Sequence, residues 1–167
     1  MFTAVADFEK TWAQESQGTQ KVLNALTDGS LSQKVADEHR TLGRVAWHIV
    51  TSIAEMMPHT GLKMESVKAD APVPKSAGEI RSAYEAVSDE LARQVKANWH
   101  DDTLQVEDEF YGETWKRGLT LDILVRHEVH HRGQMTVLMR QAGLKVPGVY
   151  GPAKEEWTSY GAPEPEV

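Results

Sequence analysis

The chain contains the stretch Leu121-Asp122-Ile123-Leu124-Val125-Arg126-His127-Glu128-Val129-His130-His131-Arg132-Gly133-Gln134, and its pattern decides the fold. The density of Leu, Ile, Val and Met over residues 119–139 predicts a helix. His127 and His131 are four residues apart, so both imidazoles lie on one face, one turn apart. Such a pair can bind one transition-metal ion as neighbouring ligands. His130 points about 100° away from His131 around the helix axis, so we do not expect it to share that ion.

Three other segments carry a helical pattern, and together with the first they predict an all-α protein. We expect the helices over residues 2–26, 41–60, 77–99 and 120–142. Ser76, followed three residues later by Glu79, predicts a capping box at the start of the third helix. Gly61 and Gly143 are suited to end the second and fourth helices. The predicted fold is a four-helix bundle with long crossover loops, and an irregular all-helical fold is the alternative.

The connections between the expected helices differ in length. Residues 62–74 have little periodicity and form a loop that is long for a compact domain, either an overhand crossover or a cover over a site. Residues 103–118 are irregular, with a strand-like piece at 109–111. We expect one domain over residues 1–167, with an irregular tail from about Leu144. Trp157 and Tyr160 are expected to hold part of that tail against the bundle.

The composition excludes several classes of partner and ligand. The net charge of −7, without a visible basic patch, argues against a nucleic-acid partner. No run of about 18 or more apolar residues is present, so we expect no membrane span. The beginning of the chain lacks a basic region followed by an apolar core, so we expect no signal peptide and a cytoplasmic location. There is no cysteine, so His, Asp or Glu must hold any metal.

A third metal ligand is expected from the second helix. His48 lies in the middle of that helix, whereas the other candidates lie in a connector or at helix ends; these are His39, His59 and His100. Apolar neighbours would lower the pKa of a buried histidine and keep it neutral, which is the form that binds metal. We therefore predict a metal site made of His48, His127 and His131. Core histidines without a metal are the alternative.

Several neighbouring residues receive secondary predictions. Ser52 and Glu55 project within about 40° of His48, and Glu55 is a candidate general base. Arg44 is a candidate partner for a ligand carboxylate, and three aromatic residues are expected at the mouth of the pocket; these are Trp47, Tyr111 and Trp115. Glu128 and Arg132 are spaced as a structural ion pair within one helix.

Gly133 lies inside the expected fourth helix, where glycine costs about 1 kcal/mol relative to alanine. We expect it to allow close approach of another helix or of a ligand.

These residues resemble a known family. The mid-helix His48 and the segment His127-x-x-x-His131-Arg132-Gly133-Gln134 look like the DinB/YfiT-like superfamily of small bacterial metal-binding four-helix bundles. Residues 140–152 are also similar to DinB-type members. The resemblance implies a site of these three histidines for a divalent transition metal, with zinc and nickel the common occupants. It also implies a homodimer, and a thiol-dependent transferase or isomerase that uses a low-molecular-weight thiol.

The expected function follows from the open site. Three protein ligands leave a coordination position free, as in catalytic rather than structural zinc sites. We expect a thiol-dependent S-transferase, in which the metal activates a low-molecular-weight thiol against an electrophilic small-molecule substrate. The absence of cysteine is consistent with this, because the thiol supplies the nucleophile. The alternatives are a metal-dependent hydrolase that uses metal-bound water and a non-enzymatic metal-binding stress protein.

Overall fold

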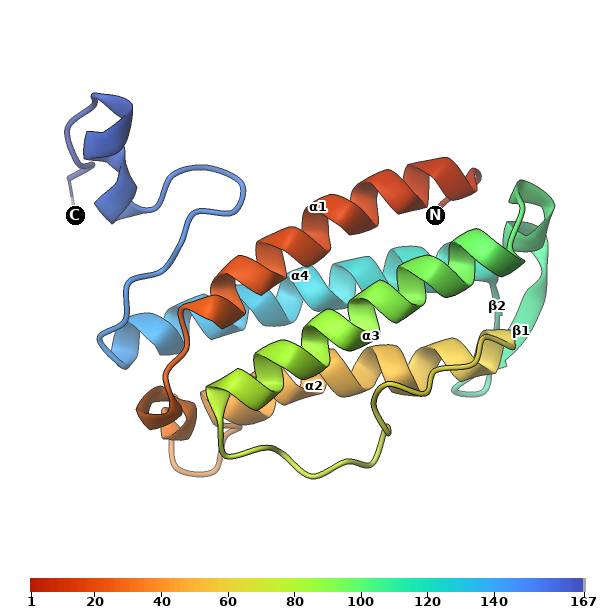
Figure 1. Ribbon diagram of the computed structural model, residues 1–167, viewed down its shortest axis with the longest axis horizontal. Helices are drawn as coiled ribbons and strands as arrows, with labels where there is room; N and C mark the ends of the chain where they lie inside the picture. Colours follow the sequence, from red (N-terminus) through yellow and green to blue (C-terminus); the bar gives the residue numbers. More distant parts are fainter. Residues whose placement is uncertain (167) are drawn as a thin grey trace.

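The computed structural model describes residues 1–166, and its four long helices lie side by side as a bundle (Figure 1). They are α1 (Val5–Asn24), α2 (Leu42–Met56), α3 (Ala77–Asn98) and α4 (Arg117–Gln141). Each begins and ends within a few residues of the range predicted from its apolar periodicity. The predicted all-α four-helix bundle is therefore confirmed.

Each helix packs against two of the others. The helix α1 contacts α3 and α4, and α2 contacts the same two, so consecutive α1 and α2 lie at opposite corners. In Figure 1, α2 and α3 run in the same direction, and the segment between them returns along the length of the bundle. This segment is the predicted crossover loop. It brings α2 and α4 together as neighbours, and both carry predicted metal ligands.

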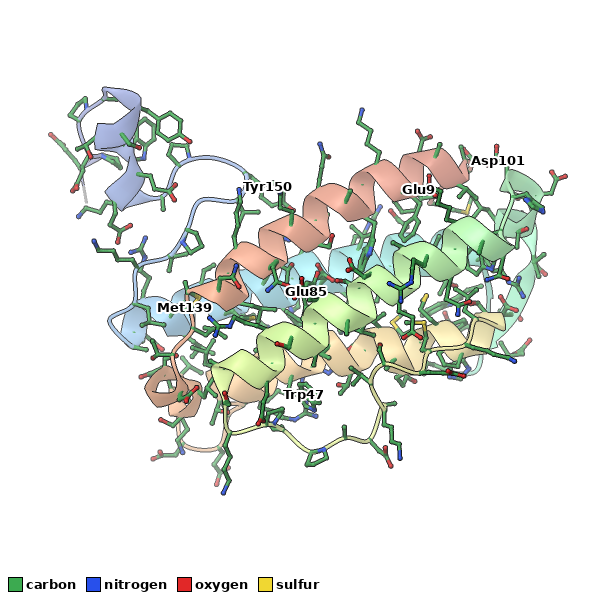
Figure 2. All side chains as sticks on the ribbon, in the orientation of Figure 1. Glu9, Trp47, Glu85, Asp101, Met139 and Tyr150 are labelled. Carbon is green, nitrogen blue, oxygen red and sulfur yellow. The ribbon has the colours of Figure 1, made fainter. Side chains whose placement is uncertain are left out.

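The crossover loop is fastened to α2 by Trp47. The indole N–H of this residue donates a hydrogen bond to the carbonyl of Ala71, 2.8 Å away. Figure 2 shows Trp47 on the side of α2 along which the loop runs. The position predicted for Trp47 at a pocket mouth is therefore wrong: its ring fills the space between helix and loop, and only 5% of its surface is exposed.

Local signals set the helix ends. Ser76 is the N-cap of α3 as predicted, but its hydroxyl accepts from the N–H of Gly78, in place of the predicted box with Glu79. The helix α2 continues into a 3-10 turn and ends at Gly61, whose φ of 82° lies in the left-handed region. Gly143 (φ 75°) follows the end of α4 in the same way, so both predicted stops are confirmed.

Short elements fill the connections. The 3-10 helices are η1 (Asp28–Ser32), η2 (Met57–Thr60), η3 (Asp101–Gln105) and η4 (Lys154–Tyr160). Between η3 and α4 the chain forms an antiparallel hairpin of β1 (Glu107–Phe110) and β2 (Glu113–Lys116). The strand-like piece predicted at 109–111 is the end of β1 and the start of its turn. The Phe110 ring stacks on Trp115 with centroids 5.0 Å apart and closes this end of the bundle.

A buried polar network crosses the bundle on the far side of α4 from α2. Glu128 Oε1 accepts hydrogen bonds from Thr19 Oγ1 on α1 and Tyr84 OH on α3, each 2.7 Å long. Arg132 donates to Thr19 Oγ1 (3.0 Å) and to the carboxylate of Glu15 (2.5 Å). Within residues 1–166 the predicted ion pair between Glu128 and Arg132 does not form, because each side chain bonds to other helices instead.

The tail after α4 is held by Tyr150. Its hydroxyl donates to Glu15 (2.7 Å) and accepts from Arg132 (2.6 Å), and Figure 2 shows Tyr150 beside α1. Tyr160, predicted to hold the tail, is 72% exposed, so that prediction is wrong for this residue; Trp157 is half-buried. Across residues 1–166, no helix has both the length and the apolar character needed to cross a membrane.

Candidate metal centre

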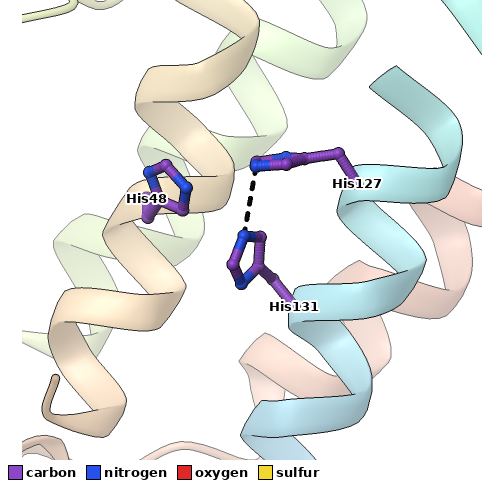
Figure 3. A group of neighbouring side chains, drawn as sticks. All are labelled: His48, His127 and His131. Atoms are coloured by element: carbon purple, nitrogen blue, oxygen red, sulfur yellow. Dashed lines mark hydrogen bonds between the residues drawn. The ribbon is translucent and has the colours of Figure 1, made fainter. Parts of the chain in front are cut away.

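Three imidazoles from two facing helices converge on one point. His48 projects from α2, and His127 and His131 project from α4 toward it (Figure 3). One ring nitrogen of each lies within 4.8 Å of those of the other two. The Nε2 atoms of His127 and His131 are 3.1 Å apart, and the His48 ring centroid lies 4.9 Å and 4.6 Å from theirs. The structure thus brings together the three residues predicted as ligands.

This spacing is suited to a transition-metal ion. Two imidazole nitrogens bound to zinc at about 2.05 Å with a tetrahedral angle lie about 3.3 Å apart. The 3.1 Å between His127 Nε2 and His131 Nε2 is close to that value. A set of three imidazoles suits zinc, nickel, copper and iron alike. The geometry and the donor set both fit a divalent metal ion.

Burial keeps the three imidazoles neutral near pH 7. It is the main cause that lowers the pKa of His48 from 6.5 to about 4, with smaller contributions from His131 and His127. The pKa of His127 is also lowered to about 4, first by burial and then by His131. Burial likewise lowers the pKa of His131, against an opposing hydrogen bond to Gln134. All three are therefore in the form that binds metal.

Hydrogen bonds orient the rings. His131 Nδ1 lies 2.7 Å from Gln134 Oε1, and because an amide oxygen can only accept, Nδ1 carries the proton and Nε2 is free for a metal. The amide nitrogen of Gln134 lies 3.0 Å from His130 Nε2, outside the three-histidine group, as helix geometry predicted for His130. On α2, Ser52 Oγ lies 3.4 Å from His48 Nδ1. Gln134 and Ser52 thus limit rotation of two of the three rings.

A cavity of about 600 Å³ opens beside His131. Its lining residues come from the connector before α2, from α2 and from α4; they are Val35, Glu38, His39, Arg40, Val45, His131, Gln134, Val137 and Leu138. The predicted aromatic mouth is wrong, because neither Tyr111 nor Trp115 lines this cavity. Both belong to the hairpin, where their rings pack on each other and on Phe110.

Arg40 is a cavity residue that the sequence analysis did not identify. Arg40, Arg44 and His48 recur every four residues, and this spacing was the available signal. It was missed because Arg40 precedes the N-cap of α2 and so lies outside the helix on which that spacing has meaning.

Glu55 lies in a different cluster on α2. Its Oε2 accepts a hydrogen bond from Tyr111 OH (2.7 Å), and its Oε1 is 3.7 Å from His59 Nε2. Burial and this carboxylate raise the pKa of Tyr111 to about 12. Glu55 does not line the cavity beside His131. Its role as a general base stays a prediction, which a Glu55→Gln variant tests.

Gly133 does not lie at a close approach between helices, contrary to the expectation from the sequence. Nothing lies within 4 Å of where its Cβ would be, and the residue is exposed, so it does not permit a close approach within this chain.

Fold and site together define a four-helix bundle with a three-histidine cluster that fits a metal ion. The sequence profile of the DinB family matches residues 1–167. The chain belongs to the DinB family.

Known relatives agree with this assignment. The uncharacterized protein YrdA of Bacillus subtilis (strain 168) is 46% identical over 167 residues, covering the whole of both chains. A crystal structure of a DinB-like protein from Bacillus cereus ATCC 10987 is 47% identical and superimposes with a TM-score of 0.86, covering 90% of this chain and 100% of that one. A second solved structure, the DinB-like protein YjoA of Bacillus subtilis, is 14% identical with a TM-score of 0.68 over 86% of this chain and 97% of that one. This last likeness concerns the fold alone.

Proposed function

We propose that this protein is a metal-dependent, thiol-dependent S-transferase. His48, His127 and His131 would hold one divalent transition-metal ion, with zinc or nickel the expected occupant. The observation behind the proposal is the convergence of three neutral imidazoles beside a cavity of about 600 Å³. Three protein ligands leave room for an exogenous ligand, which is the pattern of catalytic rather than structural zinc sites.

The bound ion would lower the pKa of a low-molecular-weight thiol, so that the thiol is deprotonated at neutral pH and reacts with an electrophilic small molecule. The chain itself contributes the ligand set and the cavity. Gln134 fixes the tautomer of His131, and apolar side chains such as Val45 and Leu138 offer a surface to the apolar part of a substrate. The chain has no cysteine, which agrees with a nucleophile supplied by a co-substrate.

The test is conjugate formation with a fluorogenic halide such as monochlorobimane. Protein produced without an affinity tag is loaded with zinc or nickel and assayed with and without cysteine or another small thiol. The proposal predicts turnover that needs both metal and thiol and that is lost in His127→Ala. Hydrolytic turnover of an ester or amide panel without thiol would favour the hydrolase instead. Metal binding without turnover on either panel would favour a non-enzymatic metal-binding protein.

The proposal includes a homodimer and a cytoplasmic location. The resemblance to DinB-type proteins supports the dimer, and the reducing cytoplasm is the compartment in which small thiols stay reduced. Size-exclusion chromatography with light scattering tests the dimer: the expected mass is twice the 18.6 kDa of one chain. A mass of 18.6 kDa at micromolar concentration would contradict it.

A further inference from the structure

Arg40 differs from the arginines that the fold uses for ion pairs. Four arginines lie within 4.0 Å of carboxylates; they are Arg117 with Asp108, Arg126 with Asp122, Arg132 with Glu15 and Arg140 with Glu155. Among the residues that the structure describes, no carboxylate lies within this distance of Arg40, and its guanidinium donates no hydrogen bond. Its five N–H groups are therefore available to a ligand.

The position of Arg40 connects it to the histidine cluster. It lines the same cavity as His131 and Gln134. His131 is one of the three candidate metal ligands, so a molecule in this cavity can contact Arg40 and also face the three-histidine centre.

Glu38 is the acidic residue of the same cavity. Both Glu38 and Arg40 are exposed, so solvent and salt weaken the interaction between their charges. Within the described part of the chain the two side chains form no ion pair, so Glu38 does not occupy the guanidinium of Arg40 in place of a ligand carboxylate.

We propose that Arg40 forms an anion subsite that binds the carboxylate of the thiol co-substrate, while the sulfur of the same molecule reaches the three-histidine centre. This rests on the proposed function, and it narrows the co-substrate to a carboxylate-bearing low-molecular-weight thiol. The planar guanidinium matches a carboxylate through two parallel hydrogen bonds. A cavity of about 600 Å³ is ample for such a molecule.

The surroundings favour this ligand over a neutral or cationic thiol. The apolar side chains of the cavity, which include Val35, Val45 and Val137, offer contacts to the hydrocarbon part of such a molecule. A ligand carboxylate would supply the partner that the chain does not give Arg40.

The experiment compares two thiols of equal chain length on cobalt-substituted, full-length protein. Cobalt(II) takes zinc sites and reports thiolate binding through its visible absorption, so affinity is measured without turnover. The probes are 3-mercaptopropionate and the neutral 3-mercapto-1-propanol. Because Arg40 is exposed, we expect the carboxylate thiol to gain about two- to fivefold in affinity from the Arg–carboxylate pair, and Arg40→Gln to lose that gain.

The matched control is Arg44→Gln, which removes the same charge one turn along and does not line the cavity. Differences in the intrinsic chemistry of the two thiols cancel when the ratio of their affinities is compared between variants. The subsite is overturned if the ratio of the two affinities in Arg40→Gln equals that of the wild type, or if Arg44→Gln reduces this ratio as much as Arg40→Gln does. If the two thiols bind equally to the wild type, the subsite fails and the thiol centre stands. If neither thiol changes the cobalt spectrum, the proposed function itself fails.

Discussion

The replacement of Arg132 by Met tests whether the buried polar network stabilises the bundle. Arg132 is 3% exposed and joins α4 to α1 and to the tail. Its guanidinium donates to the carbonyl of Glu15 (2.9 Å), the carboxylate of Glu15 (2.5 Å), Thr19 Oγ1 (3.0 Å) and Tyr150 OH (2.6 Å). Met keeps most of the apolar stem and removes all four hydrogen bonds.

The magnitude follows from what the substitution leaves behind. Breaking a buried ion pair by removing one partner costs about 3–5 kcal/mol, because the other charge stays buried without a counter-charge. The Glu15 side chain keeps 13% exposure and a hydrogen bond from Tyr150, which places the loss at the lower end. We therefore expect the free energy of unfolding to fall by about 3 kcal/mol. For a chain of this size that corresponds to roughly 6–12 °C in Tm.

The assay is urea unfolding at pH 7 with chelator in excess, so that metal binding does not contribute. Arg126→Met is the matched control: it lies on the same helix and pairs with Asp122 at 3.0 Å, but its side chain is 75% exposed. An exposed pair of this kind contributes about 0.5 kcal/mol or less. A loss in Arg132→Met no greater than in Arg126→Met would refute the stabilising role of the network.

Three further outcomes are expected. With chelator present, the free energy of unfolding falls by roughly 1–2 kcal/mol as the pH drops from 6.5 toward 4, because imidazoles of the unfolded chain take up protons near pH 6.5, whereas His48 and His127 of the folded chain do so only near pH 4. Urea unfolding of the wild type and of His127→Asn at several pH values checks this, and the free energy of unfolding of the variant should depend less on pH. Gln134→Leu should weaken zinc binding about tenfold in a competition with a chelating dye, because His131 loses its orienting acceptor; an unchanged affinity would contradict that role. Gly61→Ala should cost about 1 kcal/mol in urea unfolding, because alanine at φ 82° is strained; no loss would mean that the turn relaxes freely.

The helices and the histidine cluster could be predicted because both depend on short-range spacing. Apolar periodicity located all four helices to within a few residues. His127 and His131 share a helix face by their spacing alone, and His48 needed only a facing neighbour, which the crossover loop provides by placing α2 beside α4.

Contacts across the bundle could not be predicted in the same way. The helix α4 packs against α2 on one side and α1 on another, so polar residues outside the histidine face are also buried. Glu128 and Arg132 fit an intrahelical pair by sequence, yet their partners are far away in the chain, at Thr19, Tyr84 and Glu15. Arg40 was missed because it precedes the N-cap of α2, so its four-residue spacing to Arg44 and His48 does not place it on the helix.

The central claim is that one ion is held by His48, His127 and His131. The most direct measurement is the metal content of protein purified without an affinity tag, beside His48→Ala and the control His130→Ala. His130 is adjacent to the cluster but outside it. We predict about one divalent ion per chain in the wild type and in His130→Ala, and its loss in His48→Ala. A wild type that holds no metal even after incubation with zinc or nickel would contradict the claim, as would full metal content in His48→Ala.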